Sequence, residues 1–544
     1  MSGFAQEFGP ALLIATLAAP FVVLAVSLWM RLRAIAWAMT PLAAAPALAA
    51  AVLAIAGAPF GAELSAPRVS LWLDRPGGLL LGAAALVWLI RSVFALSDGA
   101  GRPNADRFAV SWLLTMAGSL GVFIAADLLT FYLMYALVSV PAYYLVAHDE
   151  DLAARRAGGV YLAFALIGEA ALLIAFVMLA VGEPGGSLSI RDVVAALPAS
   201  PWRDAALALI ILGFGMKIAL VPLHGWMPLA YTAAPIPAAA VLSGAAVKAG
   251  VIGLIRFLPF GAGLSNWGEA LAWAGFLSAF YGVAIGVTQR NPKTALAYSS
   301  ISQMGVIAAA LGMGLAGAEQ GAATNVAFYA ANHVLVKAAL FLTVGVVAAR
   351  QGRGRSLALI VGAVLALGLA GLPLTGGSLA KLAVKDQFGG GAAGLAAQLS
   401  AAGSTALMLH FIIQLARSPT ESAASPERLG SWAAMAVAAL AVPWLMFSAI
   451  SSPAAPFEPA KLWDATWPML VGAALAAGLW AIRDRLPRIP VGDIVAAEEA
   501  GFRASLRLGE AFDKADRDMR QWPAAGLALI VIVLALAAAG YAGR

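Results

Sequence analysis

The sequence predicts an all-α protein that crosses a membrane many times, and three properties of the chain support this fold class. Of its 544 residues, 62% are hydrophobic and 11% are charged, whereas roughly 25% are charged in a soluble globular protein. The mean hydropathy is +0.87, and long apolar runs recur along the whole length. These runs are continuous rather than alternating, so they favour transmembrane helices over the strands of a barrel.

Windows of about 20 apolar residues locate the individual spans. We expect about 14–16 transmembrane helices, and sixteen windows qualify: 11–29, 35–56, 78–96, 109–126, 128–147, 160–181, 205–226, 236–258, 269–288, 295–315, 322–348, 357–378, 392–415, 430–450, 467–482 and 523–541. No basic segment precedes the first run, which is therefore interpreted as a span and not as a cleaved signal peptide.

The charges of the loops support this count. If the N-terminus lies outside, the inner loops hold Arg31 and Arg33; Arg102 and Arg107; Arg155 and Arg156; Arg290 and Lys293; Arg350, Arg353 and Arg355; Arg417 and Arg428; and Arg483, Arg485 and Arg488. The outer loops at 57–77, 182–204, 259–268 and 316–321 hold only Arg68, Arg75, Arg191 and Arg203. The positive-inside rule predicts this alternation, and an extra or missing span would disrupt it.

One late segment departs from the apolar pattern. From Asp493 to Trp522, charges are dense while residues such as Phe502 and Phe512 recur at mostly helical intervals. We interpret residues 488–522 as an amphipathic lateral helix on the cytoplasmic face, followed by a C-terminal transmembrane anchor at 523–544. A solvated linker to the last span is the alternative.

Lysines inside the apolar spans are the candidates for function. Lys217, Lys248 and Lys337 fall inside spans, and Lys381 and Lys385 lie at the end of another. An ionisable side chain at membrane depth costs at least a few kcal/mol, so such residues face the protein interior and mark ion pathways. Burial also tunes how strongly a lysine holds its proton. Several such lysines in one chain predict a proton relay.

Two of these lysines lie beside predicted helix breaks. Pro222 follows Lys217 within a glycine-rich stretch, and Pro373 precedes Lys381 in another. Proline removes a backbone donor and interrupts a helix, and paired interrupted helices are typical of transporters built from inverted repeats. We therefore expect broken helices 7 and 12 within two inverted repeats of five helices each, while a packing kink with a snorkelling Lys217 is the alternative.

The repeats define a division of the chain. N-terminal helices 1–3 occupy residues 1–108, the first repeat (helices 4–8) 109–258, the second repeat (helices 9–13) 269–415, and helices 14–15 residues 430–482.

Other polar side chains complete the predicted relay. His333 and Lys337 are four residues apart, on one helix face, so a proton can pass between them. Glu169 is the carboxylate nearest the middle of a span and is a partner for Lys217. Secondary candidates are His224, Lys385, Asp386 and His410. The sequence around His410 is about equally compatible with a structural role in the core.

Several kinds of chemistry are not expected. The chain has no cysteine, and its four histidines show no ligand spacing, so we expect no metal or cofactor. It has no phosphate-binding loop, no dinucleotide fingerprint and no Ser–His–Asp arrangement, so we expect no catalytic site of its own. The arginines in loops fit membrane topology better than nucleic-acid binding.

Three long motifs resemble a known family. The block from Gly213 to Phe257, the run NPKTALAYSSISQMG from Asn291 and the run NHVLVKAALFL from Asn332 are similar to the antiporter-like subunits of respiratory complex I. Related subunits occur in membrane-bound [NiFe] hydrogenases and in Mrp-type sodium/proton antiporters. The resemblance covers roughly spans 4 to 13.

The resemblance implies roles for individual residues. Lys217, Lys248 and Lys381 match the lysines of helices 7, 8 and 12, and His333 and Lys337 match the histidine and lysine of helix 11. In the family these residues form a hydrated polar axis along the middle of the membrane.

One position departs from the family pattern. Where the family has a glutamate in helix 5 as partner of the helix 7 lysine, this chain has Ala136. Either Glu169 substitutes as the partner, which is the interpretation we prefer, or the first half of the protein has lost coupled transport.

The resemblance also predicts the setting. We expect a proton-translocating subunit of a multi-subunit energy-coupling complex in the inner (cytoplasmic) membrane of a prokaryote, with the lateral helix contacting neighbouring subunits. The alternatives are a subunit of a non-redox Mrp-type antiporter or of a bicarbonate- or carbon dioxide-accumulating complex, and a scaffold that conducts no ions.

Overall fold

The computed structural model describes residues 2–29, 31–65, 68–99, 105–149, 151–420, 426–485, 487 and 489–495. The chain divides into two units, Met1–Val491 and Gly492–Arg544. The predicted anchor and nearly all of the predicted lateral helix fall outside the described residues. The architecture and the site below concern the first unit.

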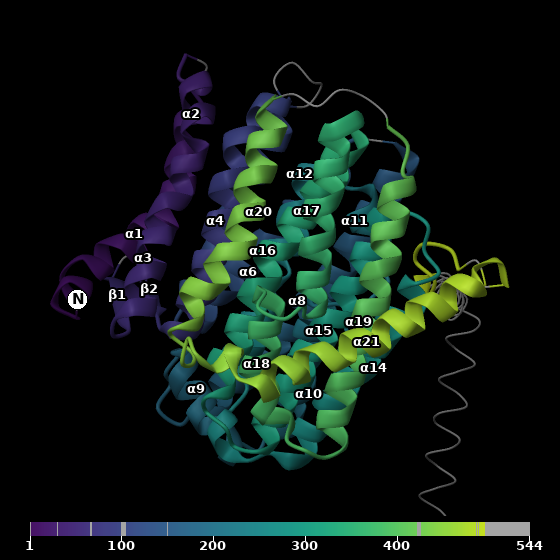
Figure 1. Ribbon diagram of the computed structural model, residues 1–544. Coiled ribbons are helices and arrows are strands. Elements are labelled where there is room, and N and C mark those ends of the chain that lie inside the picture. The colour runs from purple at the N-terminus through teal and green to yellow at the C-terminus, as the bar shows by residue number, and fades with distance from the viewer. Residues whose placement is uncertain are drawn as a thin grey trace, which may run out of the picture. The chain divides into compact units, whose positions relative to one another are not determined.

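The first unit is a helical bundle with one small hairpin (Figure 1). The N-terminal part comprises α1 (Ser2–Ser27), α2 (Arg33–Met39), α3 (Ala45–Ala56), β1 (Phe60–Ser65), β2 (Arg68–Leu73) and α4 (Arg75–Gly99). The next part comprises α5 (Ala105–Ile124), α6 (Leu128–Ser139), α7 (Ala142–Val146), α8 (Leu152–Gly182), α9 (Ile190–Ala196), α10 (Arg203–Lys217), α11 (Trp226–Ala233), α12 (Ile236–Val241) and α13 (Lys248–Phe257). The last part comprises α14 (Ser265–Gly286), α15 (Pro292–Ala316), α16 (Ala322–Ala348), α17 (Gly352–Ala370), α18 (Gly376–Phe388), α19 (Ala392–Arg417), α20 (Pro426–Phe447) and α21 (Pro459–Ala481).

The predicted fold class is confirmed. Thirteen helical segments of the described part are long and apolar enough to cross a membrane. Helix α4 covers the further predicted span 78–96, and α10 covers residues 205–217 of the predicted span 205–226.

The most deeply buried helices form the centre of the bundle. The spans at Ile236–Ala262, Pro292–Ala316 and Ala322–Ala348 are 100%, 89% and 94% buried over their apolar windows. Small residues let α14 and α15 approach closely: a Cβ at Gly275 would lie 2.5 Å from the Gly305 carbonyl oxygen. The helices that carry Lys248, His333 and Lys337 are therefore screened from lipid by the rest of the protein.

A β-hairpin occupies part of the segment that the sequence analysis treats as the outer loop 57–77. β1 and β2 pair antiparallel from Phe60 opposite Leu73 to Ser65 opposite Arg68. Phe60 and Leu73 are buried. Each strand has six residues, too short for its alternation to stand out among long apolar runs.

Helix α21 covers the predicted span 467–482 but crosses the bundle obliquely, over α18 and α19 (Figure 1). At the crossing, a Cβ on Gly472 would lie 2.3 Å from the Ala402 carbonyl oxygen. An ion pair between Lys385 and Asp464 joins α18 to α21. The length of an apolar run shows that a helix can span the membrane, whereas the tilt of that helix depends on contacts such as these.

Candidate functional site

The first part of the site is an interrupted helix. Helix α10 ends at Lys217 and α11 begins at Trp226, with Pro222 in the connecting segment. Ala219 has a φ of 59°, a left-handed conformation that stops helical propagation. The Trp226 indole donates a hydrogen bond of 2.8 Å to the Met216 carbonyl oxygen, which replaces part of the missing helical bonding.

Lys217 points into a cluster formed by α6 and α8. Its ammonium donates a hydrogen bond of 2.8 Å to the Ser139 hydroxyl and lies 5.3 Å and 5.7 Å from the ring centroids of Tyr135 and Tyr161. The Ser139 hydroxyl donates a hydrogen bond of 3.1 Å to the Tyr135 carbonyl oxygen of the same helix. The Glu169 carboxylate lies close enough to Ser139 and Lys217 to interact electrostatically with both. Glu169 and Lys217 are only 5% and 6% exposed. A buried acid, a buried base and a serine hydroxyl thus lie in one cluster.

This geometry bears on the missing glutamate of helix 5. Ser139 follows Ala136 by three residues, so the two positions share one face of α6. From that face Ser139 reaches Lys217, while the acid comes from Glu169 on the next long helix. The arrangement supports the interpretation in which Glu169 substitutes as the partner. Its role in transport stays a prediction.

The central part of the site lies around Lys248. A π-helical segment, Leu242–Ala246, precedes α13 and displaces the backbone from regular α-helical bonding. The Ser243 carbonyl oxygen accepts a hydrogen bond of 3.2 Å from the Lys248 ammonium. The same ammonium lies 2.6 Å from Nδ1 of His333 on α16, and both side chains are fully buried.

His333 and Lys337 project from the same helix but have different partners. His333 faces Lys248. Lys337 turns toward α15, where it donates to the Leu296 carbonyl oxygen at 2.7 Å and to the Ser299 hydroxyl. Sequence spacing alone pairs His333 with Lys337; the structure adds a contact between His333 and a lysine 85 positions away.

The third part of the site is a second interrupted helix. Helix α17 ends at Ala370, and the chain passes through left-handed conformations at Gly371 and Leu374 before α18 begins at Gly376. Pro373 lies in this connection. Lys381, on α18, donates to the Ala370 carbonyl oxygen, which the end of α17 leaves without a helical partner. At this break, the end of the first half of the interrupted helix thus binds the lysine of the second half.

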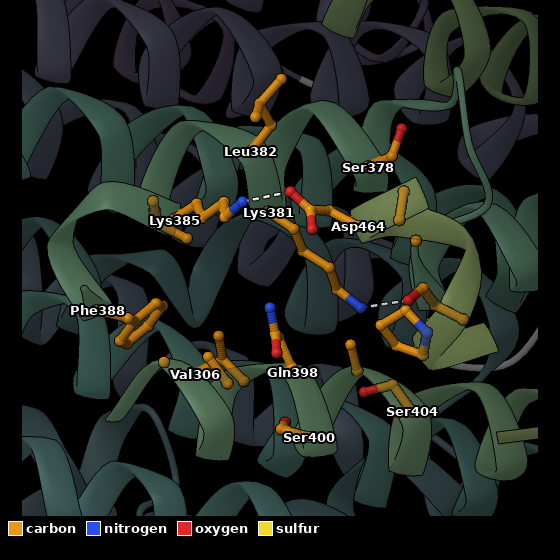
Figure 2. A pocket seen from close by; sticks show the side chains of 18 of the residues that line it. Val306, Ser378, Lys381, Leu382, Lys385, Phe388, Gln398, Ser400, Ser404 and Asp464 are labelled. Carbon is orange, nitrogen blue, oxygen red and sulfur yellow. Dashed lines mark hydrogen bonds and ion pairs between the residues drawn. The ribbon is translucent and has the colours of Figure 1, made fainter. Parts of the chain in front are cut away.

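Lys381 borders a cavity of about 110 Å³ between α15, α18, α19 and α21 (Figure 2). Figure 2 shows Lys381 directed into the cavity, whereas Lys385 is directed to Asp464. Three hydrogen-bonded side chains lie in the same region. The Tyr329 hydroxyl donates to the Gln303 side-chain oxygen at 2.7 Å, and the Gln303 side-chain nitrogen donates to the Ser404 hydroxyl at 3.0 Å. The space is large enough for a few water molecules beside these polar groups.

The remaining candidates lie at other places. Asp386 is exposed in the last turn of α18. His224 is fully buried in the first helix break, with its ring 4.8 Å from that of Tyr281. His410 is half-buried on α19, where its Nε2 lies 2.6 Å from the Gln289 carbonyl oxygen.

Several polar residues of the site were not singled out from the sequence: Ser139, Ser299, Gln303, Tyr329 and Asp464. Serine and glutamine within an apolar span are the available signal, but that signal does not say which lysine each one contacts. Among the described residues, no three His, Asp or Glu side chains are grouped to hold a metal ion.

The fold and the site define a multi-spanning helical membrane protein whose interior contains a series of lysines beside interrupted helices. The chain belongs to the family described as "NADH:quinone oxidoreductase/Mrp antiporter, TM", which matches residues 125–408, just over half of the chain. The resemblance seen in the sequence is thereby confirmed.

Individual relatives come from different complexes. The chain is 33% identical over 336 residues to NADH-quinone oxidoreductase subunit N of Desulforudis audaxviator, covering 58% of this chain and 65% of that protein. It is 28% identical over 299 residues to hydrogenase-4 component B of Escherichia coli, covering 52% and 44%. The chain thus spans about half to two-thirds of these curated relatives.

A solved structure shares the fold. The chain superposes with a TM-score of 0.75 and 22% identity on the structure of the Mrp complex from Dietzia sp. DQ12-45-1b, covering 98% of this chain and 63% of that one.

Proposed function

We propose that this chain is a proton-translocating, antiporter-like subunit of a multi-subunit membrane complex. The observation that carries the proposal is a series of interior lysines: Lys217, Lys248 and Lys337 are buried, and Lys381 is half-buried beside the second helix break. His333 is in hydrogen-bonding contact with Lys248. A buried ammonium without a facing carboxylate is costly. Folding stability alone gives no reason to keep these lysines in the interior.

The contacts of each lysine suit proton exchange. Lys248, Lys337 and Lys381 are held by carbonyl oxygens, a hydroxyl group and an imidazole nitrogen. These neutral groups hold an ammonium in position without fixing its charge as a carboxylate does. A lysine in such a setting can alternate between protonated and neutral forms, and His333 can pass a proton to or from Lys248.

The first lysine has a different partner. In this proposal Glu169 and Ser139 together hold Lys217 protonated, and a change in the separation of Glu169 from Lys217 releases the proton. The proposal rests on the interactions of Ser139 with both groups. The breaks at Pro222 and Pro373 then provide the moving parts of two five-helix repeats, 109–258 and 269–415.

The second candidate is a subunit of a non-redox cation/proton antiporter. The observation that favours it is a relative among the matching proteins, a subunit of a probable K(+)/H(+) antiporter of Rhizobium meliloti. The series of interior lysines serves proton movement equally in a redox pump and in an antiporter.

We further propose the setting of the subunit. The arginine-rich loops face the cytoplasm of a prokaryote whose inner membrane holds the complex. The segment 488–522, most of which lies outside the described residues, is proposed to contact the neighbouring subunits.

Purification of the intact complex from its native membrane tests both candidates. We expect the complex to acidify or alkalinise proteoliposomes when it is energised, and its other chains to distinguish the two candidates. Redox subunits and proton movement driven by an electron donor support the first, whereas proton movement driven by a sodium or potassium gradient supports the second. A complex that moves no protons under either condition contradicts both.

A further inference from the structure

The cavity beside Lys381 is lined by charged groups of both signs. Besides Lys381, its charged side chains are Lys385 on α18 and Lys461 and Asp464 on α21. Among the described residues that line the cavity, Asp464 is the one carboxylate. Figure 2 shows Lys381 and Asp464 beside the same cavity. Because a lysine ammonium can release a proton and a carboxylate can accept one, the cavity has a proton donor and a proton acceptor in its walls.

One face of α21 forms a wall of this cavity. Lys461, Asp464 and Pro468 all line it, and their positions i, i+3 and i+7 share a single helix face. The opposite face is apolar, since Trp463 and Leu470 are 60% and 58% exposed. Helix α21 therefore turns Asp464 toward the cavity and its apolar side chains away from it.

The cavity also offers a polar group that suits water. Ser400 is fully buried on α19 and lines the cavity, and its hydroxyl has no hydrogen-bond partner among the described residues. Buried hydroxyl groups are usually hydrogen-bonded, and a volume of about 110 Å³ is large enough for a few water molecules. Water in the cavity would satisfy Ser400 and connect the Lys381 ammonium to the Asp464 carboxylate.

Asp464 lies at the edge of the bundle. Its side chain is 32% exposed, and the side chain of its ion-pair partner Lys385 is 39% exposed. Gly389, at the end of α18, is exposed and also lines the cavity. Charged side chains are unfavourable in contact with hydrocarbon, so we interpret this edge as a polar opening. The cavity thus extends from an interior lysine to the surface of the subunit.

We propose that Asp464 receives the proton that Lys381 releases and passes it out of the subunit. This role rests on the proposed function and adds an exit to it. An N–H bond of the Lys381 ammonium breaks as water in the cavity takes up the proton, and the water gives a proton to the Asp464 carboxylate, which becomes a carboxylic acid. Asp464 then loses this proton to water at the edge of the bundle, and its carboxylate pairs again with Lys385.

The test uses the intact complex in proteoliposomes and measures the rate of proton movement per assembled complex. Asp464→Asn removes the proton acceptor and keeps a side chain of similar size. Lys385→Gln breaks the same ion pair but leaves the carboxylate in place, and Asp464→Glu changes the length of the side chain but keeps a carboxylate. The matched control is Asp106→Asn, since Asp106 on α5 forms an ion pair with Arg33 on α2, and neither residue lines the cavity.

We expect Asp464→Asn to lower the rate of proton movement by about 100-fold, the lower end of the range for loss of a proton-transfer group. Lys385→Gln should lower the rate by less than about tenfold, because a partly exposed ion pair contributes little by itself. Asp464→Glu should keep most of the wild-type rate, and Asp106→Asn should leave the rate unchanged. If Asp464→Asn does not assemble, the double variant Asp464→Asn, Lys385→Gln takes its place with the same expected loss, since it leaves neither charge unpaired.

Three results overturn the proposal. They are a wild-type rate for Asp464→Asn, equal losses for Asp464→Asn and Lys385→Gln, and an Asp464→Glu variant as slow as Asp464→Asn. Equal losses would mean that the ion pair only holds α18 against α21. A wild-type complex that moves no protons contradicts the proposed function itself, whereas an active wild type with an equally active Asp464→Asn variant contradicts only the exit.

Discussion

Ser139 offers a direct test of how the first lysine is paired. Its hydroxyl group accepts a hydrogen bond of 2.8 Å from Lys217 and interacts with Glu169. A hydrogen bond to a charged group contributes about 1.5–3 kcal/mol, and each 1.4 kcal/mol is a factor of ten in rate. If transport needs the protonated form of Lys217, Ser139→Ala should lower the rate of proton movement by about 10- to 150-fold. Glu169→Gln should lower this rate by a similar factor.

The double variant decides whether the two residues act as one unit. Ser139 and Glu169 act on the same ammonium, so their effects should not multiply. We expect the rate of proton movement of the double variant Ser139→Ala, Glu169→Gln to lie within about threefold of the rate of the slower single variant. The assay is proton movement by the reconstituted complex, normalised to the amount of assembled protein. Ser302→Ala is the matched control, since Ser302 is buried and its hydroxyl has no hydrogen-bond partner among the described residues. Single variants with wild-type rates, or a double variant whose loss equals the product of the two, would refute the reasoning.

Two further predictions concern stability. Gly472→Val should lower the thermal unfolding midpoint in detergent, because a Cβ there meets the α19 backbone and overpacking costs about 1–3 kcal/mol. Gly478→Ala, on the same helix with open space around it, should leave the midpoint unchanged. Equal midpoints for the two variants would contradict the close crossing of α21 and α19. Asp74 binds Arg256 with hydrogen bonds of 2.5 Å and 2.8 Å. Burial alone raises the pKa of the Asp74 carboxyl, but Arg256 outweighs this effect and the net pKa is lowered. The pair therefore stabilises the fold above the unfolded-state pKa of about 3.9 and loses this contribution as the pH falls through the lower folded-state pKa. Asp74→Asn should cost about 1–3 kcal/mol at neutral pH and nothing in acid, whereas Asp106→Asn, at an exposed ion pair, should cost little at either pH. Equal losses for Asp74→Asn in acid and at neutral pH would be inconsistent with this account.

The sequence was sufficient to locate the lysines and to suggest Glu169 as a partner, but not to locate the hydroxyl and carbonyl groups that contact the lysines. Lys217 and Lys381 stand out because a proline lies close to each of them in an apolar run, and proline interrupts a helix wherever it occurs. Ser139 does not stand out, because its contact with Lys217 joins residues 78 positions apart. Such a contact depends on how α6 packs against α10, and local composition does not specify packing.

Two features of the fold could not be predicted from the sequence, because both depend on tertiary contacts. The π-helical segment before Lys248 contains only small and apolar residues plus Ser243, which are equally compatible with an α-helix. The oblique course of α21 depends on the close approach at Gly472 and on the Lys385–Asp464 ion pair. Both are tertiary contacts, and a hydropathy window cannot distinguish a helix that crosses its neighbours from one that runs along them.

Replacement of Lys248 tests the central claim most directly, because the side chain is fully buried beside His333. Arginine keeps a positive charge but does not release its proton in proteins, whereas methionine removes the charge. The assay is proton movement by reconstituted complexes that assemble to wild-type amounts. The account predicts that Lys248→Arg and Lys248→Met both reduce the rate at least about 100-fold, the lower end of the range for loss of a proton-transfer group. A Lys248→Arg complex that moves protons at the wild-type rate would contradict it, since a fixed charge would then suffice.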